Sequence, residues 1–229
     1  MLVFLKKKIK RYILKSDCFI GGYKIADFGK IGDHCKIGPD CILVPKNMYI
    51  DDYVIIQGRN NFISYKGKLV IKRFSVISSS CIIIPGNHVL SVGIPFYLNT
   101  ISHVGDDEHI IVINEDVWIG AGCKILPKSS FGRGCVVATG SVVTKEIPPY
   151  AVVAGCPAKI IAVKFSKEDI IEHEKRIYPS NERLSTEQLD ILFKRYYRDV
   201  MSLKKYNYTQ EEENCLKDLV DRLNMDITI

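Results

Sequence analysis

Three of the five histidines in the chain, His88, His103 and His109, fall within one segment between Pro85 and Ile110. An imidazole titrates near neutral pH, so it can take a proton from a hydroxyl and later return one to a leaving group. Three imidazoles that converge on one point can instead hold a zinc ion. Because all three crowd one irregular loop, the pattern favours a general base over a metal centre.

The elements that must position this segment follow a six-residue pattern, which is clearest from Ile113 to Lys145. Each unit begins with an apolar residue, and its fifth place is usually small. A period of six matches neither the 3.6 residues of a helical turn nor the alternation of a simple strand. It predicts a solenoid in which each hexad makes one short strand and one corner. We expect the leading residue to fill the interior and the small fifth residue to let the backbone turn; the fifth places of this run are Val117, Cys123, Ser129, Cys135 and Ser141.

The same register begins at Ile25, slips after Leu43 and again near Tyr65, and fails completely between Pro85 and Ile110. We interpret the slips as loops at corners, which stacked coils tolerate. The long interruption, about 85–110, is unlike an idle connection, because long loops in compact domains usually have a function or are disordered. Its apolar residues argue against disorder and predict packing against a neighbouring subunit or a wall of the site; they include Leu90, Ile94, Phe96, Tyr97, Leu98 and Ile101.

The composition changes on both sides of the solenoid, which we place at residues 25–163. Residues 1–24 are basic and amphipathic and predict a cap on the open end of the coils, with weak membrane contact as the alternative. Residues 164–229 predict an α-helical extension, with helices that begin after Ser166 and near Ser185 and a third at Gln210–Leu223. The extension fits a structural cap or an acceptor-binding appendage equally well.

The overall composition bounds the class of protein. An apolar fraction of 47% and a charged fraction of 25% are those of an ordinary globule. No apolar stretch reaches the ~18–20 residues that span a bilayer, and the absence of a secretory pattern predicts a cytoplasmic protein. A net charge of +6 without a nucleic-acid motif argues against nucleic-acid binding. The eight cysteines form no CxxC pair, which favours reduced packing residues; five lie at fifth places, namely Cys35, Cys41, Cys81, Cys123 and Cys135.

Three motifs near the end of the solenoid resemble the C-terminal signature of the hexapeptide-repeat acyltransferases. They are Val117-Trp118-Ile119-Gly120-Ala121-Gly122, Gly140-Ser141-Val142-Val143-Thr144-Lys145-Glu146-Ile147-Pro148-Pro149-Tyr150, and Ala154-Gly155-Cys156-Pro157-Ala158-Lys159. The resemblance covers roughly residues 25–163. It implies a mainly β fold, a left-handed parallel β-helix with three hexads per coil, which is an exception to the usual handedness of crossovers. It also implies a homotrimer with active sites between subunits.

The resemblance implies that a histidine in the loop before the Trp-Ile-Gly hexad acts as the general base. The matching residue is His88. Asn87 precedes it where the family commonly has Gly or Asp, and this residue either orients the ring or serves the turn. His103 and His109 are the alternative bases.

The co-substrate implied by the resemblance is acetyl-coenzyme A, lying between two solenoids, with no metal required. Lysine side chains place compact positive charge near its phosphates, and backbone amides can approach a ligand closely beside a residue without Cβ. The outward Trp118 predicts a wall for the pantetheine arm or the acceptor. Some members carry a second basic residue where Ala162 stands here, and Lys164 is a replacement candidate. The other coenzyme-binding candidates are Ala121, Thr139, Gly140, Ser141, Thr144, Lys145 and Lys159.

Together these features predict an acetyl-CoA-dependent O-acetyltransferase that modifies a sugar hydroxyl, on a cell-surface polysaccharide or its precursor. The apolar loop, basic N-terminus and helical tail suit a large acceptor. A small acceptor, such as an antibiotic, a free sugar or an amino sugar, is the alternative within the same chemistry. A metal-dependent β-helix hydratase and a catalytically silent scaffold are the alternatives from other classes.

Overall fold

The computed structural model describes residues 19–229. The chain divides into two compact units after Ile160, and each unit is described by itself below. Most of the basic segment predicted as an N-terminal cap, up to residue 18, lies outside the described residues. None of the helices that the structure describes combines the length and the apolar character needed to cross a bilayer.

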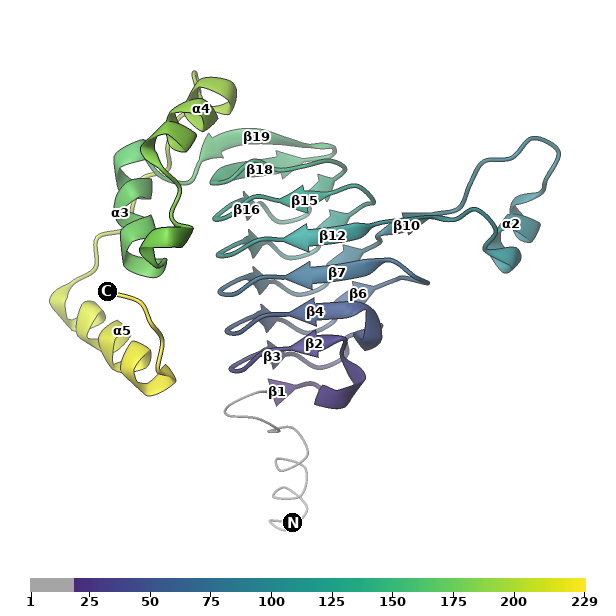
Figure 1. Cartoon of the computed structure of the whole chain (residues 1–229), viewed down its shortest axis with the longest axis horizontal. Coiled ribbons are helices and arrows are strands. Elements are labelled where there is room, and N and C mark those ends of the chain that lie inside the picture. The colour runs from purple at the N-terminus through teal and green to yellow at the C-terminus, as the bar shows by residue number, and fades with distance from the viewer. Residues whose placement is uncertain (1–18) are drawn as a thin grey trace, which may run out of the picture. The chain divides into compact units, whose positions relative to one another are not determined.

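The first unit is a solenoid of short strands stacked in parallel, like the rungs of a ladder (Figure 1). Two of its sheets are visible as long stacks. The larger contains, in order, β1 (Phe19–Ile20), β3 (Lys36–Ile37), β5 (Ile55–Ile56), β8 (Val76–Ile77), β13 (Trp118–Ile119), β16 (Val136–Val137), β18 (Ala151–Gly155) and β19 (Ala158–Val163). The second contains β15 (Ser130–Phe131), β12 (Ile110–Ile113), β7 (Lys68–Ile71), β4 (Met48–Ile50) and β2 (Lys30–Ile31).

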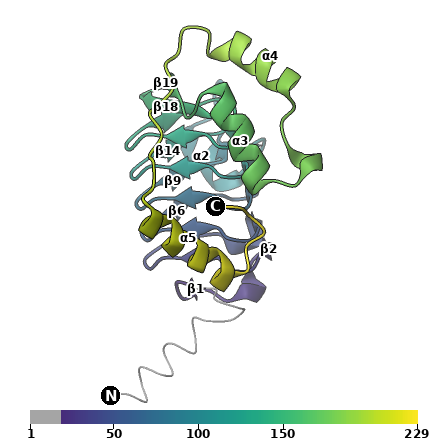
Figure 2. The same ribbon diagram turned by 90° about the vertical axis from the view of Figure 1, so that its left-hand side faces the viewer.

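A third stack completes the coils, and Figure 2 shows three of its strands one above another. Its order is β17 (Val142–Val143), β14 (Lys124–Ile125), β9 (Ile82–Ile83) and β6 (Asn61–Phe62). The leading residue of each hexad lies inside and is almost fully buried, as the pattern predicts; examples are Ile37, Ile71, Ile77, Ile113, Ile119, Ile125, Val137 and Val143. The mainly β solenoid with parallel strands is therefore confirmed.

The corners turn at a different place in the hexad from the predicted one. Left-handed backbone conformations recur every six residues along the regular run, at the fourth place. Their φ angles are 55° at Asp116, 68° at Gly122, 67° at Lys128, 68° at Gly134 and 74° at Gly140. Glycine and aspartate adopt this region more readily than most residues, which explains their frequency there. The fourth residue, not the small fifth one, turns the backbone.

The fifth residue has a different role, because its side chain is buried inside the corner and bonds to the backbone of a stacked coil. Cys81 Sγ donates to the carbonyl of Gly120 at 3.2 Å, and Ser129 Oγ donates to that of Val143 at 3.1 Å. A small side chain with one donor thus adds a hydrogen bond between stacked coils at the corner. The predicted burial is confirmed for four of the five cysteines, namely Cys35, Cys81, Cys123 and Cys135, whereas Cys41 is partly exposed.

The first strand lies before the predicted start of the hexads. β1 pairs in parallel with β3, whereas Ile25–Asp27 forms a short 3₁₀ helix, η1, in place of a strand. The carboxylate of Asp27 accepts a hydrogen bond from the amide of Lys24 at 3.1 Å, which closes this turn. At the first register slip a second 3₁₀ helix, η2 (Pro45–Asn47), occupies the corner.

The second unit, from residue 161, contains three α-helices with side-chain caps. They are α3 (Lys167–Ile177), α4 (Thr186–Tyr196) and α5 (Gln210–Leu223), with a short 3₁₀ helix, η3 (Ser180–Glu182), between the first two. Ser166 and Ser185, near which the sequence predicts the starts of two helices, accept hydrogen bonds from the amides of Asp169 and Gln188. Such caps satisfy amides that have no partner within the helix.

Candidate functional site

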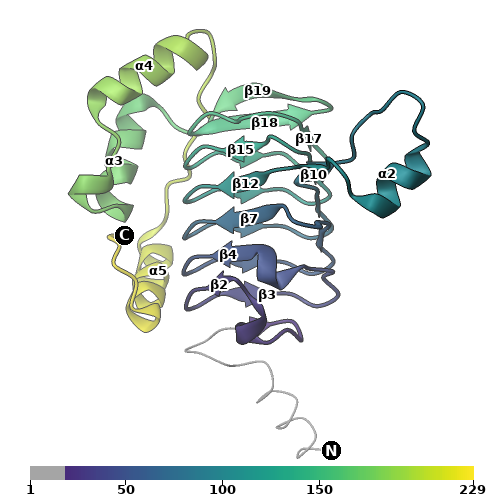
Figure 3. The same ribbon diagram turned by 45° about the vertical axis from the view of Figure 1, so that its right-hand side comes forward.

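The long interruption of the repeat is an excursion that leaves the solenoid and returns to it without disturbing the stack. Figure 3 shows it projecting from the coils as two adjacent strands that carry helix α2 (Phe96–Ser102) at the far end. The strands are β10 (Gly86–Asn87) and β11 (Asp107–Glu108), and they pair antiparallel. The coils before and after the excursion stay in register, since β12 pairs with β7 over four residues.

The base of the excursion is fixed by Glu108, whose carboxylate accepts hydrogen bonds from the amide of Gly67 at 2.7 Å and of Lys66 at 3.3 Å. The carboxylate lies so close to two glycines that a Cβ would not fit. A Cβ on Gly67 would lie 2.5 Å from Glu108 Oε2, and one on Gly86 would lie 2.6 Å from the same atom. Glycine at both positions therefore permits this anchor.

Helix α2 is held to the outgoing chain by Asn99, which is buried and donates from Nδ2 to the carbonyl of Val89 at 3.0 Å. The apolar side chains around it face outward. Val92 and Leu90 are fully or almost fully exposed, and other exposed side chains of the excursion are Ile94, Phe96, Tyr97, Leu98, Ile101 and Val104. An apolar patch of this kind is typical of an interaction surface.

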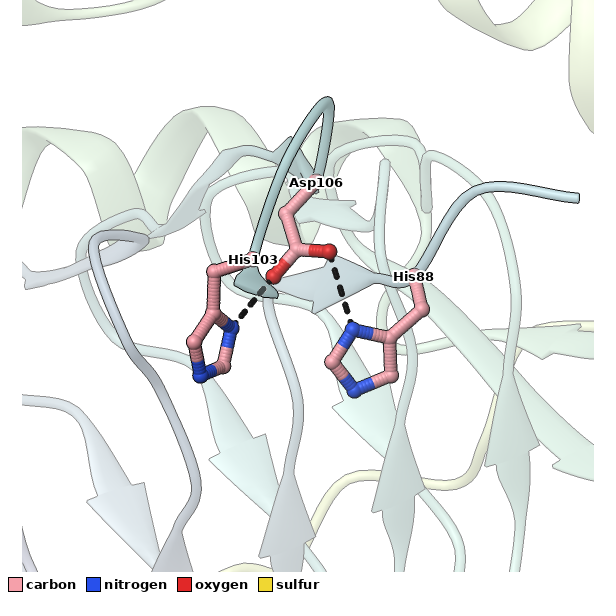
Figure 4. A group of neighbouring side chains, drawn as sticks. All are labelled: His88, His103 and Asp106. Carbon is pink, nitrogen blue, oxygen red and sulfur yellow. Dashed lines mark hydrogen bonds and ion pairs between the residues drawn. The ribbon is translucent and has the colours of Figure 1, made fainter. Parts of the chain in front are cut away.

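At the root of the excursion, one carboxylate holds two imidazoles (Figure 4). Asp106 Oδ1 lies 2.9 Å from Nδ1 of His88, and Asp106 Oδ2 lies 2.7 Å from Nδ1 of His103. The Asp106 side chain is only 8% exposed, while the two histidines keep about a third of their surface: 35% for His88 and 32% for His103. Two rings are therefore presented to solvent by one nearly buried acid.

The hydrogen bond from His103, and then that from His88, holds the pKa of Asp106 below its ordinary value of 3.8. An ionised carboxylate only accepts hydrogen bonds, so each histidine must carry its proton on Nδ1 when the ring is neutral. The Nε2 atom of each ring is then the basic one. Both Nε2 atoms lie on the side of their rings that faces away from the carboxylate (Figure 4). This arrangement prepares a ring to accept a proton from a ligand.

A cavity of about 450 Å³ opens beside these rings. The ring of Tyr65 stacks on that of His103, with centroids 4.1 Å apart and planes 9° from parallel. The cavity takes residues from both the solenoid and the excursion: Ile63, Ser64, Tyr65, Ile84, Gly86, Asn87, His88, His103, Asp106 and Glu108. Its mixed apolar and hydrogen-bonding wall fits a small polar group presented to His88.

His109, the third histidine of the segment, is placed elsewhere. Its Nε2 lies 3.0 Å from Asp107 Oδ1, and Lys128 Nζ lies 3.2 Å from the other oxygen of Asp107. A three-histidine zinc site needs all three rings at one point. In the described part of the chain, the one group with metal-ligand geometry is His88, His103 and Asp106, with ligand atoms within 4.8 Å of one another. In that group, Nδ1 of each histidine is in hydrogen-bonding contact with the Asp106 carboxylate.

The residue that contacts Nδ1 of His88 is Asp106, at 2.9 Å, whereas Asn87 was expected either to orient the ring or to serve the turn. Asn87 is exposed, lies in β10 opposite Asp107, and lines the cavity. Sequence reasoning missed Asp106 because it lies 18 residues after His88, in an acidic run that gave no signal of pairing. The antiparallel register of β10 and β11 brings the two together.

The coenzyme-binding candidates lie on other parts of the solenoid. Trp118 is 54% exposed on β13, and its indole donates to Ser78 Oγ at 3.2 Å. Neither Trp118 nor any other coenzyme candidate is among the described residues that line the His88 cavity. Within one chain, the predicted base and the predicted coenzyme contacts are therefore apart. The exposed candidates near the end of the coils are Thr139, Gly140, Thr144, Lys145 and Lys159, and Ala121 is partly exposed.

The amides of Gly140 and Ser141, expected to approach a ligand, are occupied within the coils. The amide of Gly140 donates to Ala121 at 2.8 Å, and that of Ser141 donates to Ala138 at 3.3 Å. The Ser141 hydroxyl is buried and bonds to the same carbonyl at 2.6 Å. The corner is nevertheless open to a ligand, because a Cβ built on Gly140 or Gly122 would meet nothing within 4 Å.

We expect Gly86→Ala to destabilise the root of the excursion, because the added methyl would lie 2.6 Å from Glu108 Oε2 and 2.7 Å from its Cδ. Overpacking of this kind costs about 1–3 kcal/mol. Thermal unfolding followed by circular dichroism measures the loss. In the double variant Gly86→Ala, Glu108→Ala the added methyl should cost less than it does alone; equal costs in the two backgrounds would contradict this origin.

Comparison with known proteins shows similarity to acetyltransferases over part of the chain. No family model matches the chain. The chain is 35% identical over 119 residues to a chloramphenicol acetyltransferase of Morganella morganii, covering 45% of this chain and 55% of that protein. It is 45% identical over 76 residues to the serine acetyltransferase of Buchnera aphidicola, and this match covers 33% of this chain and 29% of that protein. The chain thus spans about half of the first relative's length and less of the second.

A solved hexapeptide-repeat acetyltransferase from Vibrio cholerae matches the fold with a TM-score of 0.54 and 27% identity, over 61% of this chain and 76% of that one. The solenoid has the fold of the hexapeptide-repeat acetyltransferases. The same Vibrio protein has also been solved with acetyl-coenzyme A, and that structure matches with a TM-score of 0.53 and 26% identity. The suspected family is therefore supported by both sequence and fold.

Proposed function

We propose that this protein is an acetyl-CoA-dependent O-acetyltransferase that uses His88 as its general base on a sugar hydroxyl. The observation that carries the proposal is the His88 ring held through Nδ1 by the nearly buried Asp106, with Nε2 turned away from the carboxylate at an open cavity. The excursion that builds this pair lies directly before the hexads similar to those of acetyltransferases.

In the proposed reaction, Nε2 of His88 takes the proton of the acceptor hydroxyl as its oxygen attacks the thioester carbonyl. Asp106 keeps the ring in the required tautomer and stabilises the imidazolium that forms. The C–S bond then breaks, and the imidazolium returns the proton to the leaving thiolate. The products are an acetyl ester and the free thiol of the coenzyme. No metal takes part in this sequence.

The donor would lie along the outer face of the last coils, against Trp118, the open corners at Ala121 and Gly140, and the exposed hydroxyls of Thr139 and Thr144. Lys145 and Lys159 would place positive charge near the phosphates. Ser141 supports this corner through its internal hydrogen bonds. These residues, of which Ser141 is buried and Ala121 partly exposed, are together called the coenzyme strip below.

The separation between the coenzyme strip and the His88 cavity supports a further part of the proposal, namely a homotrimer of left-handed β-helices. In such an assembly the strip of one chain completes the cavity of the next. The exposed apolar side chains of the excursion, such as Leu90 and Val92, favour burial against a second copy. The donor is a cytoplasmic metabolite, so the proposal places the reaction in the cytoplasm.

A sugar acceptor fits the cavity, since its wall offers several polar groups, Ser64, Asn87 and Glu108 among them, beside apolar ones. The long excursion and the helical unit suit a polysaccharide unit or its precursor. A small antibiotic hydroxyl is the second candidate, favoured by the similarity to a chloramphenicol acetyltransferase. Release of the coenzyme thiol, measured with free sugars, oligosaccharides, amino sugars and chloramphenicol, distinguishes the candidates; no release with any acceptor contradicts the proposal.

We expect Lys159→Ala to weaken coenzyme binding by about tenfold, the effect of losing one charge-assisted contact to phosphate, and to change the chemical step less. Calorimetric titration with coenzyme A measures the dissociation constant. Lys36→Ala, which removes an equally exposed lysine from the other end of the same sheet, is the matched control. An unchanged dissociation constant in the Lys159 variant would remove this lysine from the coenzyme strip.

A further inference from the structure

The helical unit contains a cavity of its own, of about 370 Å³, that the proposed chemistry does not use. All of its lining residues belong to residues 165–213, within the second compact unit. The walls come from helix α3, from the segment before α5, and from the first turn of α5. Its volume falls in the range of ligand pockets, roughly 300–1,000 Å³.

The charged groups of this cavity neutralise one another in pairs. Lys205 Nζ lies 2.7 Å from Asp169 Oδ1, and Arg176 Nε lies 2.9 Å from Glu172 Oε1. These hydrogen bonds hold the pKa of both acids below the ordinary values. With Glu213 as the one further charge, three acids face two bases. A cavity so balanced has no strong attraction for a polyanion, yet it presents many hydrogen-bonding groups to a neutral ligand.

Aromatic rings and Asn207 form the rest of the wall. Tyr206 and Tyr208 are 66% and 53% exposed, and their rings meet edge to face with centroids 5.0 Å apart. The Tyr206 hydroxyl donates to Glu212 Oε1 at 3.0 Å, which fixes the first ring. Phe165 adds a third ring to the cavity. Exposed tyrosines supply rigid area with an apolar body and a polar tip.

We propose that this cavity binds a neutral oligosaccharide segment of the acceptor. A sugar ring offers an apolar face of C–H groups, which packs on aromatic rings, and a rim of hydroxyls, which pair with planar carboxylate, guanidinium and amide groups. Tyr206 and Tyr208 supply the first kind of contact. Glu172, Arg176 and Asn207 supply the second.

The inference rests on the proposed function and adds an acceptor class to it, a glycan long enough to be held at the helical unit while another residue reacts. A second attachment point raises the effective concentration of the reacting hydroxyl without any new contact at the base. The helical extension then contributes to the recognition of long acceptors.

Calorimetry with the full chain and no coenzyme tests the proposal directly. The probes are maltohexaose, cellohexaose and the hexamer of N-acetylglucosamine, with a heparin hexasaccharide as the anionic comparison. We expect one of the neutral probes to bind and Tyr206→Ala, Tyr208→Ala to weaken it at least about tenfold, as loss of aromatic anchors does. No neutral binding, tighter binding of heparin, or binding unchanged in this variant overturns the proposal.

The matched controls separate this site from the base and from misfolding. Ile191→Ala removes an exposed apolar side chain of the same unit outside the cavity and should bind the probe normally. The single variants Tyr208→Ala and Asn207→Ala affect exposed side chains, so they remain informative if the double variant unfolds; both should weaken binding. His88→Ala should bind the hexasaccharide unchanged. Thiol release absent from the wild type with glycan binding intact would refute only the proposed function.

Discussion

Replacing His88 by alanine is expected to lower turnover by about 10²–10⁴-fold, the usual contribution of a general base. The reason is that the substitution removes Nε2, which takes the acceptor proton in the proposed reaction. The coenzyme should still bind almost normally, because the coenzyme strip lies elsewhere on the solenoid. Steady-state thiol release measures the first effect, and calorimetry with coenzyme A measures the second.

Two histidine variants of the same excursion are the controls for this result. His109→Ala removes a ring that lies beside Asp107 and lines no part of the described cavity, so turnover should change little. His103→Phe keeps an aromatic ring for stacking on Tyr65 but loses the contact to Asp106. Normal turnover in the His88 variant together with loss in the His103 variant would move the base to His103.

Asp106→Asn is expected to lower turnover by roughly 10²–10⁴-fold with little change in stability of the fold, since the side chain keeps its shape. An amide can donate to Nδ1 of a histidine, which favours the tautomer with the proton on Nε2. The ring would then face the acceptor with a donor in place of a base. The carboxylate normally prevents this, because its bonds from His103 and His88 keep it ionised to a pH below that of an ordinary aspartate.

The pH dependence distinguishes this positioning role from a structural one. The substitution removes the negative charge beside the ring, so the acidic limb of the pH profile of kcat/KM should differ from that of the wild type. Asn87→Ala serves as the matched control, because Asn87 lines the same cavity while the contact to Nδ1 of His88 comes from Asp106. A profile in Asp106→Asn that coincides with the wild type, at any level of activity, would show that Asp106 only supports the loop.

Much of the architecture follows from local pattern. Ile113, Ile119 and Ile125 recur every six residues and lie inside the coils, since a stacked solenoid repeats its environment at the period of its sequence. The starts of two helices near Ser166 and Ser185 could also be predicted from the sequence, because the signal for a helix start lies within one turn of the chain. Helix α2 was not, since its seven residues lack a side-chain cap and are too few to show a period.

For the candidate site, too, some features could be predicted from the sequence and others could not. The sequence by itself determined the coil and the place where it is interrupted, because both are a matter of residue type and spacing, and the resemblance of its motifs to a known family indicated His88 as the candidate base. Only the tertiary structure decided that Asp106 holds the ring, that His103 shares this acid, and that His109 lies apart. These contacts depend on which residues of β10 and β11 face each other, and pairing between distant strands leaves no periodic trace in the chain.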